Sequence, residues 1–430
     1  MWRSVYVPTI ALSFAEGLLV PVLPLYVASL GVPLWWVGLV LAGEAIGMLV
    51  GDLPAGALLR RIDRRTAMLA GIGLLGAAVG ATAFVDGAPA VFALRLGAGL
   101  GAALWGISRH AYLADAVPLQ RRGRVIAAFG GAHRIGLLAG PAVGGVVAVS
   151  FGFPAVFVVY AAVAAVTLAL VAGVRDGAVS DDAAASHPTP RTAPAAAGEG
   201  ATAAARSAAW AEIAAIGTRT LLAAGAGTLL AQAIRAGRRI VIPLYGGVAL
   251  GLDVDQVGWI LSLAAAFDVA LFPVAGWVMD HLGRKAAIVP SFALQAIGMA
   301  LVPATAGFAG LAVAASLIGL GNGLGSGTMM TIGADLAPKG AMGEFLGAWR
   351  LVGDGGGMVS PVLVGGLADA LGLAAGTLAV AALGMGAVVA FAYGVPETGA
   401  VRARPAGSQR SGAGRGPRPS RWRRQQRRQT

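Results

Sequence analysis

The sequence contains no cysteine and few charged residues. The absence of cysteine excludes disulfides, thiolate metal sites and cysteine nucleophiles. Charged side chains make up only 12% of the chain, against about 25% in a typical soluble domain, and 57% of the residues are hydrophobic. A chain of this composition could not keep its surface in water, so the sequence predicts a membrane protein.

Two kinds of chemical motif are also missing. No group of His, Asp and Glu has the spacing of metal ligands, and no Gly-x-x-x-x-Gly-Lys-Ser/Thr loop is present to bind phosphate. The lack of a phosphate loop disfavours an ATP-driven pump. We therefore expect neither an enzyme nor a bound cofactor, with a membrane enzyme or receptor of the same fold as a minor alternative.

The chain instead has a series of long apolar segments. A helix needs about 20 apolar residues to cross about 30 Å of hydrocarbon. Twelve segments meet this requirement, so the sequence predicts an all-α membrane protein with twelve transmembrane helices. The predicted spans are 5–30, 36–59, 66–85, 88–112, 125–149, 153–174, 219–247, 256–279, 286–306, 308–334, 343–370 and 374–394.

Basic residues lie on alternate connections between these spans. One set of connections carries them, in segments 60–65, 121–124, 175–206 and 284–285 and at Lys339. The other set has neither Lys nor Arg. Because basic loops stay in the cytoplasm, this pattern predicts a multi-pass protein of the inner cell membrane with both termini cytoplasmic.

Two segments are too polar to span a membrane. Residues 176–212 are rich in Ala, Ser, Pro and Thr and are predicted to form a flexible cytoplasmic linker between domains 1–175 and 213–396. Residues 397–430 are predicted to form a disordered basic cytoplasmic tail. Its arginines would be attracted to anionic membrane lipid or would only fix the topology, and nucleic acid is not an expected partner.

The two halves of the chain are related by an offset of about 220 residues. Equivalent pairs include Arg64-Arg65 with Arg284-Lys285, Asp115 with Asp335, and Pro141 with Pro361. The repeat predicts two pseudo-symmetric bundles of six helices, with a substrate site between them near the middle of the membrane. We expect the chain to act as a monomer.

One loop carries a long motif. Segment 276–285 reads Gly-Trp-Val-Met-Asp-His-Leu-Gly-Arg-Lys. It fits Gly-x-x-x-Asp-x-x-Gly-Arg-Lys in full, and on this motif the chain resembles the major facilitator superfamily of transporters. The first-half copy has Arg60 where the motif has Asp, so Asp52 or Asp63 would have to supply its acidic group. The resemblance implies gating loops that contain Gly56, Arg64, Arg65, Gly276, Asp280, Gly283, Arg284 and Lys285.

Two further motifs resemble those of the drug:proton antiporters in this superfamily. Arg95 begins a segment similar to Arg-x-x-x-Gly-x-Gly-Ala, whose arginine is associated with proton coupling in the family. The longer antiporter pattern has a glycine where this chain has Ala127. The core of that pattern is Gly-Pro-x-x-Gly-Gly, preceded four positions earlier by a glycine. It is matched by Gly136, Gly140, Pro141, Gly144 and Gly145.

Sugar porters are the rival subgroup. The segment Pro396–Gly399 partly resembles a sugar-porter motif. The paired glutamines expected for sugar recognition are lacking, because Gln232 stands alone in its span. The sequence therefore favours the antiporter group and leaves sugar uptake as an alternative.

Charged residues inside the predicted spans point to function. Each costs at least about 2.5 kcal/mol at the bilayer centre. We predict proton or substrate coupling at Glu16, Glu44, Arg95, Arg235, Asp268 and Asp354. Candidates for the cavity wall are Asn322, His133 and Arg134. His133 is either a proton relay or an ordinary buried histidine.

Glu16 and Glu44 have no obvious basic partner near them in the sequence. A buried carboxyl group without a partner tends to take up a proton, which suits a proton carrier. Glu16 and Arg235 occupy nearly equivalent positions in the two halves. We expect these opposite charges to face one another and to close one side of the cavity until Glu16 is protonated.

For other charges a structural role is an equal alternative. Asp354 has the spacing to pair with Arg350 on its own helix. Asp268 could neutralise an arginine of the adjacent span. Arg238 and Arg239 could be anchors that extend to the membrane interface.

These features together predict a secondary active transporter. It would export a small amphipathic or drug-like molecule in exchange for protons, by alternating access. Its partners would be this small-molecule substrate, protons and membrane lipid. Proton-coupled uptake of a sugar or another small metabolite is the alternative.

Overall fold

The computed structural model describes residues 6–59, 61–116, 119–173, 217–338 and 341–398, apart from the side chains at 53, 57 and 110–129. The predicted linker at 176–212 and the predicted tail beyond residue 398 lie outside the described residues. Within the described part every regular element is helical, as the twelve predicted spans require.

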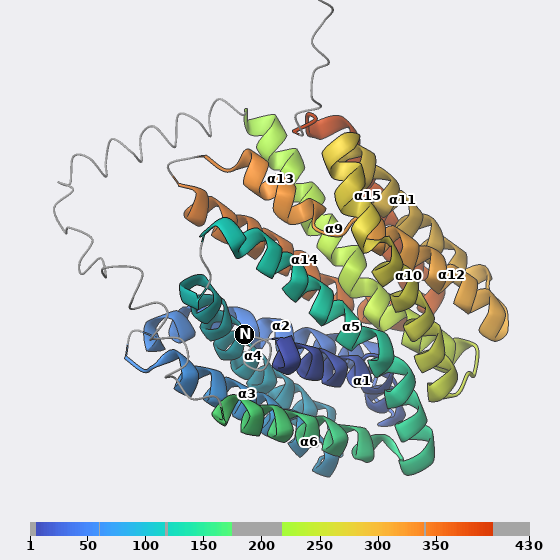
Figure 1. Ribbon diagram of the computed structural model, residues 1–430. Coiled ribbons are helices and arrows are strands. Elements are labelled where there is room, and N and C mark those ends of the chain that lie inside the picture. Colours follow the sequence, from blue (N-terminus) through green and yellow to red (C-terminus); the bar gives the residue numbers. More distant parts are fainter. Residues whose placement is uncertain (1–5, 60, 117–118, 174–216, 339–340, 399–430) are drawn as a thin grey trace, which may run out of the picture.

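The first six spans form one bundle and the last six form a second (Figure 1). The first bundle consists of α1(Val7–Ser29), α2(Leu34–Leu58), α3(Arg64–Ala81), α4(Ala88–Ala116), α5(Leu119–Phe151) and α6(Phe153–Ala172), with the short turn η2(Thr82–Phe84) after α3. The second consists of α9(Thr218–Leu244), α10(Val254–His281), α11(Arg284–Leu301), α12(Gly307–Leu324), α13(Thr328–Leu336), α14(Met342–Leu371) and α15(Leu373–Val389), with the short turns η3(Tyr245–Ala249), η4(Val302–Ala304) and η5(Ala390–Gly394). α12 and α13 are two parts of one span, and Gly327 lies between them in the left-handed conformation with φ +77°.

Eleven of the described spans are long and apolar enough to cross a membrane. The exception is α9, which has sufficient length at 27 residues but is too charged. Its charged residues are Arg219, Arg235, Arg238 and Arg239. Arginines in a lipid-embedded helix face the bundle interior or a water-filled space, so α9 directs attention to the region between the two bundles.

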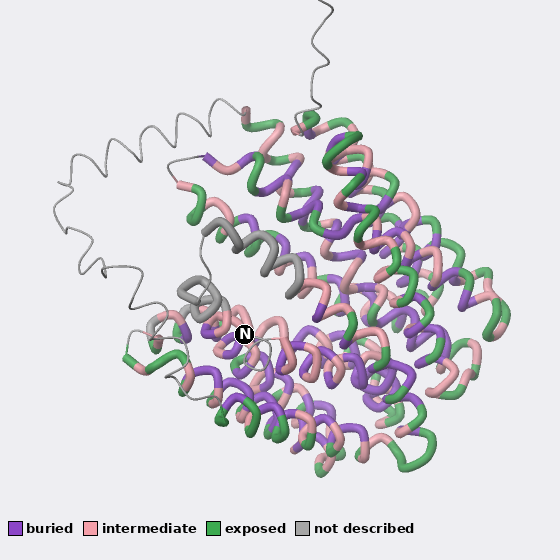
Figure 2. Tube along the Cα trace, viewed as in Figure 1, coloured by how far each residue is buried: buried purple, intermediate pink, exposed green. Residues whose placement is uncertain are grey.

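Exposed residues occur along both bundles, where the tube in Figure 2 is green, and many of them have large apolar side chains. These exposed residues include Val50, Val166, Leu222, Val313, Met330 and Leu371. An apolar surface of this extent fits contact with lipid and not with water. The polar residues that matter for function are therefore those between the helices.

The two bundles diverge toward one side of the molecule (Figure 1). We name this the linker side, because α6 ends there and α9 begins there. The opposite side is the far side. α5 packs against α10 and α2 packs against α14, and these two contacts join the bundles.

Glycines let the bundles approach closely at both contacts. A Cβ atom at Gly145 of α5 would lie 2.6 Å from Cα of Asp255 in α10. In the equivalent place of the other contact, a Cβ atom at Gly365 of α14 would lie 2.8 Å from Cα of Trp35 in α2. Neither position has room for a larger side chain, so glycine is what allows the far side to close.

The helices that begin at these two contacts are capped in different ways. The carboxylate of Asp369 in α14 accepts the backbone N–H groups of Leu34 and Trp35 at the start of α2, each at 2.8 Å. α10 is capped from its own sequence, where the backbone N–H of Asp253 donates to the side chain of Gln256 at 3.1 Å. Only the first of these caps ties one bundle to the other.

Candidate substrate and proton site

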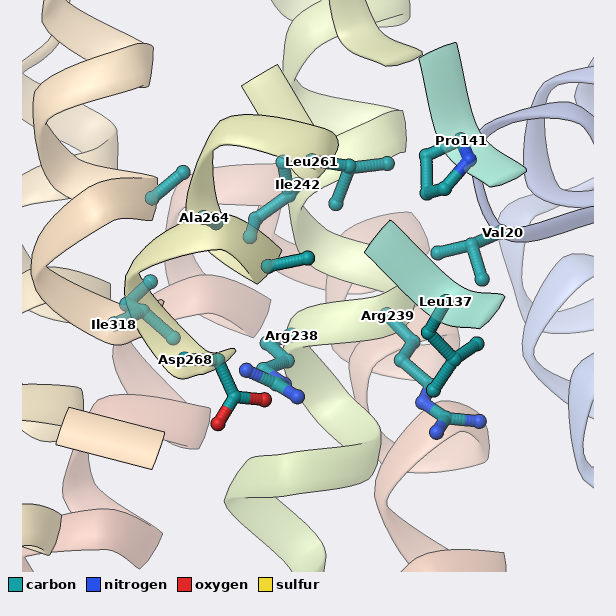
Figure 3. Close-up of a pocket in the computed structure, with 12 residues that line it drawn as sticks. Val20, Leu137, Pro141, Arg238, Arg239, Ile242, Leu261, Ala264, Asp268 and Ile318 are labelled. Atoms are coloured by element: carbon teal, nitrogen blue, oxygen red, sulfur yellow. The ribbon is translucent and has the colours of Figure 1, made fainter. Parts of the chain in front are cut away.

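A pocket lies between the bundles where α1, α5, α9, α10 and α12 meet (Figure 3). It encloses about 580 Å³, with the solvent at its mouth included. Its charged residues are Arg238, Arg239 and Asp268; Arg238 and Asp268 lie side by side in Figure 3, and Arg239 lies next to Leu137. Its remaining wall is apolar and is formed by Val20, Leu137, Pro141, Ile242, Leu261, Ala264, Ala265, Ala315 and Ile318.

The charged and apolar parts of the pocket lie at different depths. Along α10, which starts at the far side, Leu261 comes two turns before Asp268. Along α9, which starts at the linker side, Arg238 and Arg239 come before Ile242. The charged residues therefore lie toward the linker side, together with the apolar Leu137 and Ile318, and the wall toward the far side is wholly apolar.

Glu16 joins the two bundles through an ion pair with Arg239. Nη1 of Arg239 donates to Oε1 of Glu16 at 3.0 Å. The two side chains are 36% and 48% exposed, so the pair is open to the space between the bundles. The expected opposition of Glu16 and Arg235 is wrong, because the residue that faces α1 is Arg239, one helical turn further along α9.

Arg235 binds groups of its own bundle instead. It donates to Oε1 of Gln232 at 3.2 Å and to the carbonyl oxygen of Gly325 at 3.0 Å. Its guanidinium lies 5.3 Å from the ring centroid of Phe292. The carbonyl of Gly325 is accessible because α12 ends there, so Arg235 stabilises the break in this span.

A second ionic contact between the bundles centres on Asp268. Arg134 of α5 donates to Oδ1 of Asp268 in α10. The other oxygen, Oδ2, accepts the side-chain N–H of Asn322 in α12 at 2.8 Å. Both carboxylate oxygens of Asp268 are thus engaged, and three of the predicted residues come together here.

Arg238 differs from Arg134 and Arg239 in its contacts. No hydrogen bond and no ion pair within 4.0 Å is found for it among the residues that the structure describes, although it lies beside Asp268 in the pocket (Figure 3). The interpretation of Arg238 and Arg239 as interface anchors is wrong, because both line the pocket. Arg238 and Arg239 follow Arg235 by three and four residues, which places all three on neighbouring parts of one helix surface. This spacing is the feature of the sequence that could have indicated that they line the pocket.

Glu44 also has an arginine partner. It pairs with Arg95, which lies on α4 of the same bundle. The Arg95 side chain is 9% exposed, so this pair is more enclosed than the pair between Glu16 and Arg239. The view that Glu16 and Glu44 lack basic partners is therefore wrong: each partner comes from another helix.

Two further predicted residues make local contacts. His133 of α5 shares a 2.6 Å hydrogen bond with the hydroxyl of Ser13 in α1, within the first bundle. Asp354 lies 3.5 Å from Nε of Arg350, four residues earlier on α14. The latter is the structural ion pair that the spacing allowed, and it does not touch the pocket.

The glycines of the antiporter-like segment form the contact between α5 and its neighbours. Cβ atoms at Gly136 and Gly140 would lie 2.7 Å from atoms of Ser13 and Gly17 in α1, and one at Gly144 would lie 2.8 Å from Cα of Leu18. Pro141 lines the pocket. This segment therefore sets the position of α1, and with it the position of Glu16.

Comparison with known proteins decides the family. A family model described as Major Facilitator Superfamily matches residues 6–234 and again 224–429. The chain belongs to the major facilitator superfamily. The two matches correspond to the two bundles, and they confirm the resemblance drawn from the loop motif. Membership makes this protein a membrane transporter, while the antiporter subgroup stays a prediction.

A solved structure shows the same fold. The crystal structure of a POT family transporter in complex with 5-aminolevulinic acid is similar over 90% of this chain and 95% of that chain, with a TM-score of 0.69 and 11% sequence identity. At this identity the similarity concerns the fold alone. No curated protein matches the chain.

In this superfamily member the second-half loop, at 276–285, forms a network of charges. Nε of Arg284 donates to Asp335 at 3.0 Å, and its Nη1 lies 3.9 Å from Asp280. The carboxylate of Glu397 accepts the backbone N–H groups of Arg284 and Lys285 at 2.7 and 3.0 Å. Gly283 precedes them with φ +101°, a conformation that favours glycine.

The first-half loop is built differently. Asp63 accepts the backbone N–H of Thr66 at 2.9 Å and so caps α3 from within its own sequence. This hydrogen bond holds the pKa of the Asp63 carboxyl below its usual value. Arg65 donates to the carbonyl oxygen of Ala172 at the end of α6, and Arg64 begins α3. Gly56 has open space around it, as has Gly276, and Arg60 lies outside the described residues.

Proposed function

We propose that this transporter is proton-coupled and that the ion pair between Glu16 and Arg239 is its coupling element. The supporting observation is that this pair joins α1 of one bundle to α9 of the other beside the pocket. In the superfamily's fold, the two bundles must move relative to one another to open the pocket to alternate sides. A titratable contact between them therefore links a proton to that movement.

The coupling follows from the charge of Glu16. When ionised, Glu16 holds Arg239 and keeps the two bundles together at this depth. Protonation removes the negative charge, weakens the contact and lets α1 and α9 separate. With the linker side in the cytoplasm, as the basic loops indicate, the described arrangement is the one open toward the cytoplasm.

The charges of the pocket favour uptake over export. Protonation of Glu16 releases Arg239 beside Arg238 and makes the pocket more positive. An acidic or otherwise electron-rich substrate then binds more tightly with the proton than without it. The two would travel together, so we place proton-coupled uptake of a small metabolite first.

Export of an amphipathic or drug-like molecule in exchange for protons is the second candidate. It is favoured by the resemblance of segment 136–145 to the antiporter motif. A cationic compound would suit this exchange, because it would compete with the proton for Glu16. It would, however, have to bind next to two arginines.

A flux experiment with an expressing strain tests the proposal. Cells that express the chain are screened with labelled metabolites and with a panel of toxic compounds, and the external pH is recorded. We expect at least one metabolite to enter together with protons, so that the medium becomes more alkaline. Glu16→Gln should abolish the proton movement without loss of expression, whereas Glu344→Gln, at an exposed position on α14, should behave as the unaltered chain.

Two results would contradict the proposal. Proton movement that persists in Glu16→Gln would remove Glu16 from the coupling. Resistance to toxic compounds, with dissipation of an acid-inside gradient in inverted vesicles, would replace uptake with export.

A further inference from the structure

The arginines near the pocket outnumber the carboxylates that could neutralise them. Glu16 is paired with Arg239, and Asp268 is paired with Arg134. Both oxygens of Asp268 are already occupied, by Arg134 and Asn322. Arg238 lines the pocket and is left without a hydrogen bond or ion pair among the described residues.

An arginine in this position destabilises the protein unless the negative charge of a bound ligand compensates its positive charge. A guanidinium at membrane depth is retained where it faces a cavity and serves a function. Its planar fork of N–H groups matches a carboxylate or another planar oxyanion, with two parallel hydrogen bonds. A pocket that held only water would not need an arginine at this position.

We infer that the pocket binds an amphipathic organic anion, with its carboxylate on Arg238 and its apolar part against the far-side wall. This deepens and rests on the proposed proton-coupled uptake. The apolar part would contact Val20, Pro141, Ile242 and Leu261, which line the pocket and lie above the charged groups in Figure 3. An inorganic anion would leave that wall unfilled.

The site also predicts a thermodynamic link between anion and proton. A carboxylate on Arg238 occupies the same pocket as Arg239, the partner of Glu16. Its negative charge competes with Glu16 for Arg239 and therefore favours protonation of Glu16. Because coupling between two sites is reciprocal, protonation of Glu16 strengthens anion binding to the same degree.

Binding to the purified full chain in lipid nanodiscs tests the inference. The probes are phenylpropionate, phenylpropylamine and phenylpropanol, which share an apolar part and differ in the charged end, together with decanoate and inorganic phosphate. The thermal unfolding midpoint and the uptake of protons from a weakly buffered solution are measured. We expect the two carboxylates to raise the midpoint and to cause proton uptake, and the amine, the alcohol and phosphate to do neither.

Variants separate Arg238 from general charge effects. Arg238→Gln should lower carboxylate affinity about 10- to 100-fold, the range expected for a hydrogen bond between charged groups. Arg219→Gln removes an exposed arginine from the start of the same helix and should bind as the unaltered chain. If Arg238→Gln does not fold, Arg238→Lys keeps the charge, loses the planar fork and should bind more weakly than the unaltered chain.

Several outcomes overturn the inference. These are tighter binding of phenylpropylamine than of phenylpropionate, protection by phosphate equal to that by phenylpropionate, unchanged affinity in both Arg238 variants, and failure of both carboxylates to shift the midpoint at about 10 mM. Carboxylate binding without proton uptake would support the anion site and contradict coupling at Glu16. Proton-coupled flux without carboxylate binding would support coupling at Glu16 and contradict the anion site. Failure of the anion site and failure of the proposed function are therefore distinguishable.

Discussion

The contact between α5 and α10 and the contact between α2 and α14 occupy equivalent places in the two bundles, but different groups tie them together. At the first contact, Arg134 and Asp268 meet at the depth of the pocket. The offset of about 220 residues that relates the halves places Asp354 and Met48 at the equivalent positions, where no such pair exists. At the second contact, the tie is Asp369 at the far-side rim, and its equivalent is Val149.

This difference separates two tasks. The shared glycines Gly145 and Gly365 give both contacts the same close backbone approach. The tie at pocket depth is within reach of a substrate or a proton, so occupancy of the pocket can loosen it. The tie at the rim is remote from the pocket and sets how firmly the far side closes.

The largest effect is expected from breaking the tie at pocket depth. Arg134→Gln removes the direct ionic partner of the Asp268 carboxylate in a largely enclosed site, where Asn322 and the neighbouring Arg238 remain, and should lower the free energy of unfolding by about 1.5–3 kcal/mol. Adding Asp268→Asn removes that charge and should restore most of the stability. Denaturant unfolding in mild detergent measures both.

Arg350→Gln is the control for this comparison. It breaks the exposed pair with Asp354 within α14 and should cost about 0.3–0.5 kcal/mol. If the double variant is no more stable than Arg134→Gln alone, the tie does not have the electrostatic role assigned to it.

A smaller effect is expected from crowding the shared backbone approach. Gly365→Ala places a methyl group against α2 and should cost about 1–3 kcal/mol. Gly366→Ala, one residue later in open space, should stabilise α14 by about 0.5–1 kcal/mol. The same unfolding measurement compares them, and equal effects of the two substitutions would show that the close approach is not limiting.

Of the contacts between the bundles, the rim tie is expected to affect stability least, with a larger effect on conformation. Asp369→Asn weakens the cap on α2 by about 1 kcal/mol and should favour opening of the far side. Because the natural chain has no cysteine, spin labels at Ser29→Cys and Leu371→Cys report the far-side separation without background. We expect a second, longer distance population.

Asp253→Asn provides the matched control. It alters the residue that caps α10 within one bundle, so it should leave the distance between the labels unchanged. A distance distribution that Asp369→Asn leaves unchanged would contradict the rim tie.

The sequence predicted the twelve spans, the repeat and the depth of the site, because these depend on hydropathy and on distance along a helix. Distance along the predicted spans 5–30 and 256–279 puts Glu16 and Asp268 away from the span ends, and both lie in the region between the bundles. The loop motif in segment 276–285 likewise predicted the family. These properties are local, so one sequence suffices for them.

The pairing of charges could not be predicted in the same way. Which arginine of α9 meets Glu16 depends on the axial position of α9 against α1, and a shift of about one helical turn exchanges Arg239 for Arg235. This axial position is fixed in part by Arg235, which binds the carbonyl of Gly325 at a helix break. That break depends on tertiary packing, and the hydropathy of α12 and α13 gives no sign of it.

The separation of charged and apolar parts within the pocket also fixes how a molecule is oriented during its passage. A molecule taken up from the far side meets the apolar wall first and reaches the arginines last. Its acidic end therefore leads as it arrives and leads again as it leaves, and the molecule never has to turn round. A molecule travelling the opposite way follows the same path with its apolar end first, so the layout fixes the orientation of the molecule in both directions.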